Sequence, residues 1–132
     1  MNICQWTESW ARLQPDKTAL VFNESKISYS EFNKRIRVTA TFLKQNFAVR
    51  EGERIAFLGE NSPTMLVLLL ACARLGAIFV PLNLRLEVPE YAYVLKDSGA
   101  KLLFCDERYL ETGKSASHSA GDITISVIGK QF

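Results

Sequence analysis

The sequence has few cysteines, and its positive and negative charges nearly balance. Its three cysteines, Cys4, Cys72 and Cys105, form no close pair and lack the spacing of metal ligands, so we expect no metal site and a reducing cytoplasm. Cys72 and Cys105 fall in apolar segments, so we expect both to be small core residues. The formal net charge is only +2 over 132 residues. A charge this small and dispersed argues against a protein that binds nucleic acid or a membrane surface.

Long uninterrupted apolar runs are also missing. The stretch from residue 65 to residue 82 approaches the length of a membrane span, but Arg74, Gly76 and Pro81 divide it into a helix and a strand. The first residues carry no basic region followed by an apolar core, so no secretory signal is predicted. We therefore expect a cytoplasmic protein without a transmembrane segment.

Glycine-rich phosphate-binding loops are absent as well. No Gly-x-Gly-x-x-Gly turn follows a predicted strand, which argues against a dinucleotide-binding protein. Residues 112–115, Thr-Gly-Lys-Ser, end like a nucleotide phosphate loop, but Arg108 stands where the first glycine of that motif must be. A side chain there would block the close approach of phosphate to the backbone, so we expect a flexible surface loop.

Few residues are candidates for catalysis. The only histidine, His118, lies among serines in a stretch that we expect to be a surface loop, without the rigid frame that an activated nucleophile needs. Asp97 and Asp106 are predicted to end a helix and a strand, where acidic residues commonly cap or solvate the backbone. We therefore predict no catalytic residue and no metal ligand in the chain.

The composition that remains is that of an ordinary globular domain, with 48% hydrophobic and 23% charged residues. Apolar periodicity predicts alternating elements along it. Helices are expected at residues 3–13, 28–47, 63–75, 89–96 and 107–112, strands at 19–22, 27–28, 54–58, 77–80, 101–105 and 123–128, and a loop at 114–122. This order predicts an α/β fold, a doubly wound and mostly parallel sheet with helices on both faces.

Local signals support two of these helices. Ser28 and Glu31 stand in the register of a capping box at the start of the second helix. The helix at 63–75 follows a Ser-Pro start, is apolar on every face and therefore is expected to be buried, and stops at Gly76. The apolar strand after it is expected to be covered on both faces.

Several segments together resemble one enzyme family. Residues 73–83, Ala-Arg-Leu-Gly-Ala-Ile-Phe-Val-Pro-Leu-Asn, are similar to a signature of the adenylate-forming enzymes, which include acyl-CoA synthetases and luciferases. Residues 27–32, Ile-Ser-Tyr-Ser-Glu-Phe, residues 51–56 and the pair Asn61-Ser62 resemble earlier segments of the same family in the same order. The resemblance runs from about residue 10 to residue 106, and it is most like ligases acting on fatty or aryl acids.

The resemblance implies an acyl-CoA ligase that activates a carboxylic acid, taken to be a fatty acid, through an acyl-adenylate and transfers it to coenzyme A. Such an enzyme needs ATP, Mg²⁺ and coenzyme A, yet the family's ATP-binding loops and C-terminal domain have no counterpart here. Residues 1–132 would then be an incomplete N-terminal portion of the large domain. We expect this piece to be inactive alone, to bind none of these cofactors tightly, and to leave bare the apolar surface that meets the remainder. A complete small α/β binding or regulatory module remains the alternative.

The resemblance also implies one candidate binding segment. In some members, basic side chains just after the strand equivalent to residues 101–105 reach the phosphates of coenzyme A. The cations available there are Arg108 and Lys114, with Glu107 and Glu111 close by in the sequence. Arg108 is the better candidate, because a guanidinium can hold a phosphate through two parallel hydrogen bonds.

Overall fold

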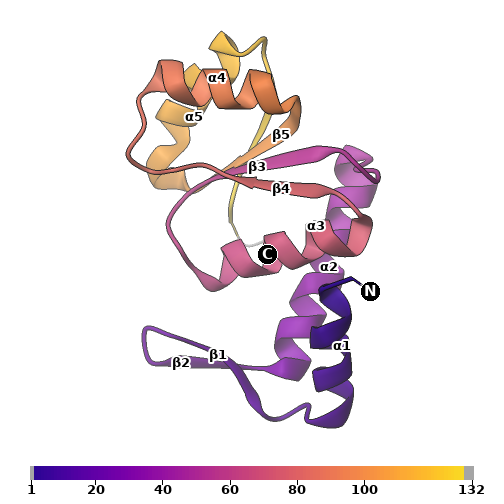
Figure 1. The fold of residues 1–132 in the computed structure, drawn as a ribbon. Helices are drawn as coiled ribbons and strands as arrows, with labels where there is room; N and C mark the ends of the chain where they lie inside the picture. Colours follow the sequence, from indigo (N-terminus) through magenta and orange to yellow (C-terminus); the bar gives the residue numbers. More distant parts are fainter. Residues whose placement is uncertain (1, 130–132) are drawn as a thin grey trace.

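The computed structural model describes residues 2–129 as a four-stranded parallel sheet between two layers of helices, with a two-stranded antiparallel hairpin at one end (Figure 1). The helices are α1 (Cys4–Leu13), α2 (Tyr29–Phe47), α3 (Pro63–Leu75), α4 (Val88–Ser98), the 3₁₀ turn η1 (Glu107–Tyr109) and α5 (Leu110–Ser119). The strands are β1 (Thr18–Phe22), β2 (Ser25–Ser28), β3 (Arg54–Leu58), β4 (Ile78–Pro81), β5 (Ala100–Cys105) and β6 (Thr124–Val127). The predicted α/β class and the parallel sheet are confirmed.

The parallel sheet has the strand order β4-β3-β5-β6, so β3 and β5 occupy its centre. Successive side chains of a strand point to opposite faces. Ile55 and Phe57 join the core formed with α2 and α3, whereas Ala56 and Leu58 join the core formed with α4 and α5. The two layers lie on opposite sides of the sheet in Figure 1. This is the predicted doubly wound arrangement.

Both ends of α3 follow the sequence signals. The Ser62 hydroxyl accepts a hydrogen bond from the Met65 N–H at 3.3 Å, and Gly76 ends the helix at φ +72°, where a residue without Cβ is favoured. The predicted burial on every face is wrong, because the contacts of α3 with the sheet, α2 and α1 leave part of its surface exposed. Leu66 keeps 39% of its surface exposed.

The capping box of α2 is only half formed. The Ser28 hydroxyl accepts from the Glu31 N–H at 3.1 Å, as predicted. The Glu31 carboxylate, however, accepts from Arg35 Nε at 3.0 Å, one turn further along the helix. An ion pair at this spacing is available on any exposed helix face and competes with the cap.

Two further expectations are corrected. Strand β4 is only partly covered: Phe79 packs on the core with α2 and α3 and Val80 on the core with α4 and α5, but the strand lies at the edge of the sheet and Ile78 is 52% exposed. The expected loop at 114–122 is mostly the helix α5, and the helix expected at 107–112 begins as the short turn η1. Gly113 and Ser117 are buried on α5 together with Ala116, so packing against the sheet overrides the weak helix preference of the glycine and the serine.

All three thiols are buried, which confirms the prediction made for Cys72 and Cys105. Burial raises the pKa of Cys72 and of Cys105 to about 12, and it also raises the pKa of Cys4, where Glu8 adds to the effect. These groups are therefore neutral and unreactive in the native protein. Among residues 2–129, none of the helices combines the length and the apolar character that a membrane crossing needs.

Candidate functional site

The carboxyl ends of β3 and β5 mark the place where this topology favours a ligand. The chain leaves β3 through α3 on one face of the sheet and leaves β5 through α5 on the other. Because β4 and β6 then lie on opposite sides of the central pair, β3 and β5 form a topological switch point. Open α/β sheets bind their ligands in the crevice outside the strand ends at such a point.

The first residues after these two strands contact each other. Asp106 Oδ2 accepts the N–H of Glu60 at 2.9 Å, and the Asp106 N–H donates to the Leu58 carbonyl at 3.0 Å. A Cβ on Gly59 would lie 2.5 Å from Asp106 Oδ2 and 2.8 Å from a ring carbon of Phe57. Position 59 therefore admits only glycine without displacement of Asp106 or the core phenylalanine.

Charged side chains cover this contact. Arg108 Nη1 lies 2.5 Å from Glu60 Oε1, and the Tyr109 hydroxyl lies 3.4 Å from the same oxygen. Arg108 is 72% and Glu60 52% exposed, so solvent screens their attraction. We call Gly59, Glu60, Asp106, Arg108 and Tyr109 the carboxyl-edge cluster.

The structure places the two predicted cations in different settings. Arg108 belongs to the carboxyl-edge cluster, and its acidic partner is Glu60 rather than the sequence neighbours Glu107 or Glu111. Lys114 lies on α5, 56% exposed, with its Nζ 3.7 Å from Glu111. Both cations are therefore accessible to solvent, and each already has a carboxylate beside it.

The sequence patterns did not identify Gly59, Glu60 or Asp106 as site residues. The contact between Glu60 and Arg108 spans 48 residues of sequence, which no local pattern reveals. A signal was nevertheless available, since Gly59 and Asp106 each directly follow a predicted buried strand. The carboxyl ends of parallel strands meet at one edge of a sheet.

The sequence candidates for other chemistry receive structural roles. Gly113 is buried in α5 against Cys105 Sγ and Ile125, so this glycine lets the helix approach the sheet and belongs to no phosphate loop. His118 is exposed on the same helix, with Nδ1 2.8 Å from Asp122 Oδ1. Asp97 is exposed near the end of α4, which precedes β5, whereas Asp106 follows that strand. The two aspartates therefore lie at opposite ends of the sheet and form no catalytic pair.

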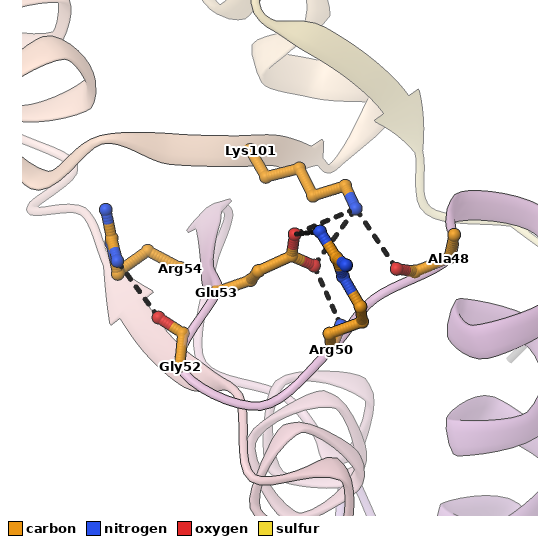
Figure 2. Close-up of polar contacts among 6 residues, drawn as sticks. All are labelled: Ala48, Arg50, Gly52, Glu53, Arg54 and Lys101. Atoms are coloured by element: carbon orange, nitrogen blue, oxygen red, sulfur yellow. Dashed lines mark hydrogen bonds and ion pairs between the residues drawn. The ribbon is translucent and has the colours of Figure 1, made fainter.

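The amino ends of the same strands carry a different network, shown in Figure 2. Lys101 Nζ lies 3.0 and 3.1 Å from the two Glu53 carboxylate oxygens and donates to the Ala48 carbonyl at 3.1 Å. Glu53 also accepts the backbone N–H of Arg50 at 2.7 Å. This N–H and, next, the Lys101 ammonium hold the pKa of Glu53 below its ordinary value. We call these four residues the amino-edge network.

The amino-edge network joins elements of the fold, and its charged side chains are paired with one another: Arg50 and Lys101 both lie beside Glu53. It connects the end of α2 to the starts of β3 and β5. Arg54 adds a second connection, because its Nε donates to the Ser98 carbonyl at 2.7 Å and its Nη1 to the Gly52 carbonyl at 3.0 Å. This edge is therefore arranged for stability, and the carboxyl edge is the candidate site.

Metal ligation is a separate question. Within residues 2–129, no three or more His, Cys, Asp and Glu side chains gather closely enough to hold a metal ion.

Comparison with known proteins finds one enzyme family, and this chain covers only a part of the relatives that it matches. A family model described as AMP-binding enzyme matches residues 7–130. An indoleacetate–CoA ligase of Aromatoleum aromaticum is 38% identical over 125 residues, 95% of this chain and 24% of the relative. A feruloyl-CoA synthase of an Amycolatopsis species is 41% identical over 107 residues, 81% of this chain and 22% of the relative.

Solved structures give the same picture. An anthranilate CoA ligase in complex with anthranoyl-AMP matches with a TM-score of 0.90 and 27% identity, covering 98% of this chain and 25% of its own. A fatty acyl CoA synthetase of Mycobacterium tuberculosis matches with a TM-score of 0.86 and 28% identity, covering 97% of this chain and 26% of its own. The chain thus spans about a quarter of the length of the relatives that it matches.

Proposed function

Since this chain belongs to the AMP-binding enzyme family, we propose that it is the N-terminal part of an ATP-dependent acid–thiol ligase that joins a carboxylic acid to coenzyme A. The family match over residues 7–130 carries the proposal. Residues 1–132 form the first part of the large domain, and the ATP-binding loops and the C-terminal domain lie outside them. The acid is proposed to be a fatty acid, with the aryl acids in the relatives' names, such as indoleacetate and feruloyl, as the other class to assay.

ATP and Mg²⁺ are proposed to bind polypeptide outside the described residues. The one Thr-Gly-Lys-Ser segment is packed as helix α5 and forms no phosphate-binding loop. The chemistry that ATP supplies, activation of the acid as an adenylate, is therefore assigned to polypeptide outside residues 2–129. The described residues contribute the sheet and the carboxyl-edge cluster.

Coenzyme A has a candidate contact in that cluster. We propose that Arg108, with Lys114 as a second and weaker contact, binds the nucleotide phosphates of coenzyme A. Three observations support the assignment: Arg108 lies at the switch point, it is 72% exposed, and its guanidinium already receives one oxyanion, the Glu60 carboxylate. Arginine binds phosphate and carboxylate oxygens through the same kind of charge-assisted hydrogen bond.

The activity is tested by pyrophosphate release from ATP with a panel of fatty and aryl acids. The polypeptide encoded by the reading frame continued past Phe132 is expected to release pyrophosphate with at least one acid and to form its coenzyme A thioester. The chain of residues 1–132 alone is expected to give no release above a control without protein. Turnover by the short chain would contradict the proposal, as would a reading frame that stops at Phe132, which favours the small-module alternative.

The role of Arg108 is tested separately from the activity. In the longer enzyme, Arg108→Ala is expected to raise the KM for coenzyme A roughly tenfold, the effect of one charge-assisted contact, and to leave adenylate formation unchanged. Arg50→Ala is the matched control, because Arg50 is a similarly exposed arginine at the amino edge. Equal losses in both half-reactions would mean that Arg108 serves folding instead.

A further inference from the structure

An apolar groove separates the hairpin from α3. It has a volume of about 380 Å³, and one wall is the end of β1 while the other is the loop before α3 and the first turn of that helix. All of its lining residues are uncharged. Six of them are apolar: Leu20, Val21, Phe22, Pro63, Met65 and Leu66. The groove shares no lining residue with the carboxyl-edge cluster, although Asn61 directly follows Glu60 in the sequence.

Large apolar side chains are exposed on both walls. Val21 is 65% exposed and Phe22 42% exposed on the hairpin, and Leu66 is 39% exposed on α3. Toward its base the hairpin is anchored, because Leu20 and Ile27 pack with residues of α2 and α3. Val21 and Phe22 lie beyond that anchor, next to the turn, and Figure 1 shows the hairpin projecting from the helices. Two-stranded hairpins are marginal without a covering layer.

We propose that this groove is the docking surface for an apolar segment of the same polypeptide, from the part of the enzyme that follows residue 132. The inference rests on the proposed function. The relatives are about four times as long as this chain, so about three quarters of such an enzyme lies outside the fold described here and is available to cover it. An uncharged lining suits a permanent interface. It offers no ion pair to a charged peptide or to the phosphates of a nucleic acid.

The size of the groove also favours an intramolecular occupant over a second copy. Stable dimers use about 20 to 30 residues on each side, far more than the eight that line this groove. A segment of the same polypeptide needs less area, because covalent linkage keeps its effective concentration high. The residues of the two walls would then become buried when the whole polypeptide folds, without a separate association step.

Thiol labelling tests the proposal on both walls. Phe22→Cys and Leu66→Cys are introduced singly, and the native thiols give little background because they are buried. In the chain of residues 1–132, both introduced thiols are expected to react rapidly with a maleimide at neutral pH. In the longer polypeptide, both rates are expected to fall by about 100-fold or more, as for groups exposed only by local opening. Lys34→Cys, on the exposed charged face of α2, is the control and should react equally at both lengths.

Two outcomes overturn the proposal. Equal labelling of Phe22→Cys and Leu66→Cys at both lengths would leave the groove without an occupant. Protection already in the short chain that increases with protein concentration would make the occupant a second copy. Amide hydrogen exchange of Val21, Phe22 and Leu66 in the unmodified protein gives the same comparison if a variant fails to fold. A longer polypeptide that protects the groove but forms no adenylate would refute the proposed function and leave this inference standing.

Discussion

The two ends of the parallel sheet use charge in opposite ways. At the amino end, Lys101 and Arg54 donate to the backbone carbonyls of Ala48 and Ser98, so these cations hold neighbouring segments together. At the carboxyl end, Arg108 contacts only the side chain of Glu60 among the polar contacts of the described residues, and both are more than half exposed. A cation fixed to the backbone stabilises a fold, whereas one paired with an exposed carboxylate can exchange that partner for a ligand.

The largest effect expected at the carboxyl end comes from shape rather than charge. Gly59→Ala would place a methyl group 2.5 Å from Asp106 Oδ2 and should lower the free energy of unfolding by about 1–3 kcal/mol, the usual cost of overpacking. Denaturant unfolding measures this loss. Asp106→Ala in the same background is the control and should remove part of the clash, so that the double variant loses less than the sum of the two single losses. Additive losses would mean that Gly59 and Asp106 do not restrict each other.

At the amino end, Lys101→Met should have the next largest effect. The change keeps the aliphatic stem and removes the hydrogen bonds to Ala48 and Glu53. Because Lys101 is partly exposed, we expect a loss of about 0.5 to 1 kcal/mol in the free energy of unfolding. Lys114→Met, which removes a lysine paired with an exposed carboxylate on α5, is the matched control and should change stability less.

The amino end should also respond to acid. The folded-state pKa of Glu53 is lowered from 4.5, so its ion pair and hydrogen bonds stabilise the protein fully above that ordinary value. The contribution should be lost as the pH falls from 4.5 through the lower folded pKa. Glu53→Gln should remove this part of the dependence of unfolding on pH. Midpoints of thermal unfolding between pH 3 and pH 7 would show it; parallel curves for the variant and the parent would contradict it.

The smallest effect is expected for Arg108→Ala. An exposed ion pair of this kind contributes little, so the free energy of unfolding should change by less than about 0.5 kcal/mol. Chemical denaturation of the variant beside Lys101→Met compares the two ends of the sheet directly. A loss as large as that of Lys101→Met would contradict the difference proposed between the two ends of the sheet, since it would make Arg108 a structural residue.

Local sequence signals predicted much of the fold. The Ser62-Pro63 start and Gly76 stop of α3 are set by backbone chemistry within a few residues, and so is the hydroxyl half of the α2 cap. The position of β4 at the edge of the sheet could not be predicted this way, because edge and centre are decided by which distant strands pair. Helix α5 was missed for a similar reason, since its small residues become helical through packing on β5 and β6.

The candidate site was predictable only in part. Arg108 was identified through a family resemblance, and its side chain is exposed at the carboxyl edge, where a ligand can reach it. Its partner Glu60 and the contact between Gly59 and Asp106 depend on β3 and β5 becoming neighbours. That pairing crosses more than 40 residues of sequence, beyond the range of periodicity and capping signals.

The central position of β3 has a consequence for synthesis on the ribosome. The strand emerges before both of its partners, β4 and β5, and at about 5 to 20 residues per second it waits roughly 2 to 8 seconds for β5. Helices α2 and α3 can cover Ile55 and Phe57 during that interval, but Ala56 and Leu58 need α4 and α5, which are made later. Nascent chains stalled just after α3 should therefore recruit holdase chaperones more strongly than chains stalled after α5.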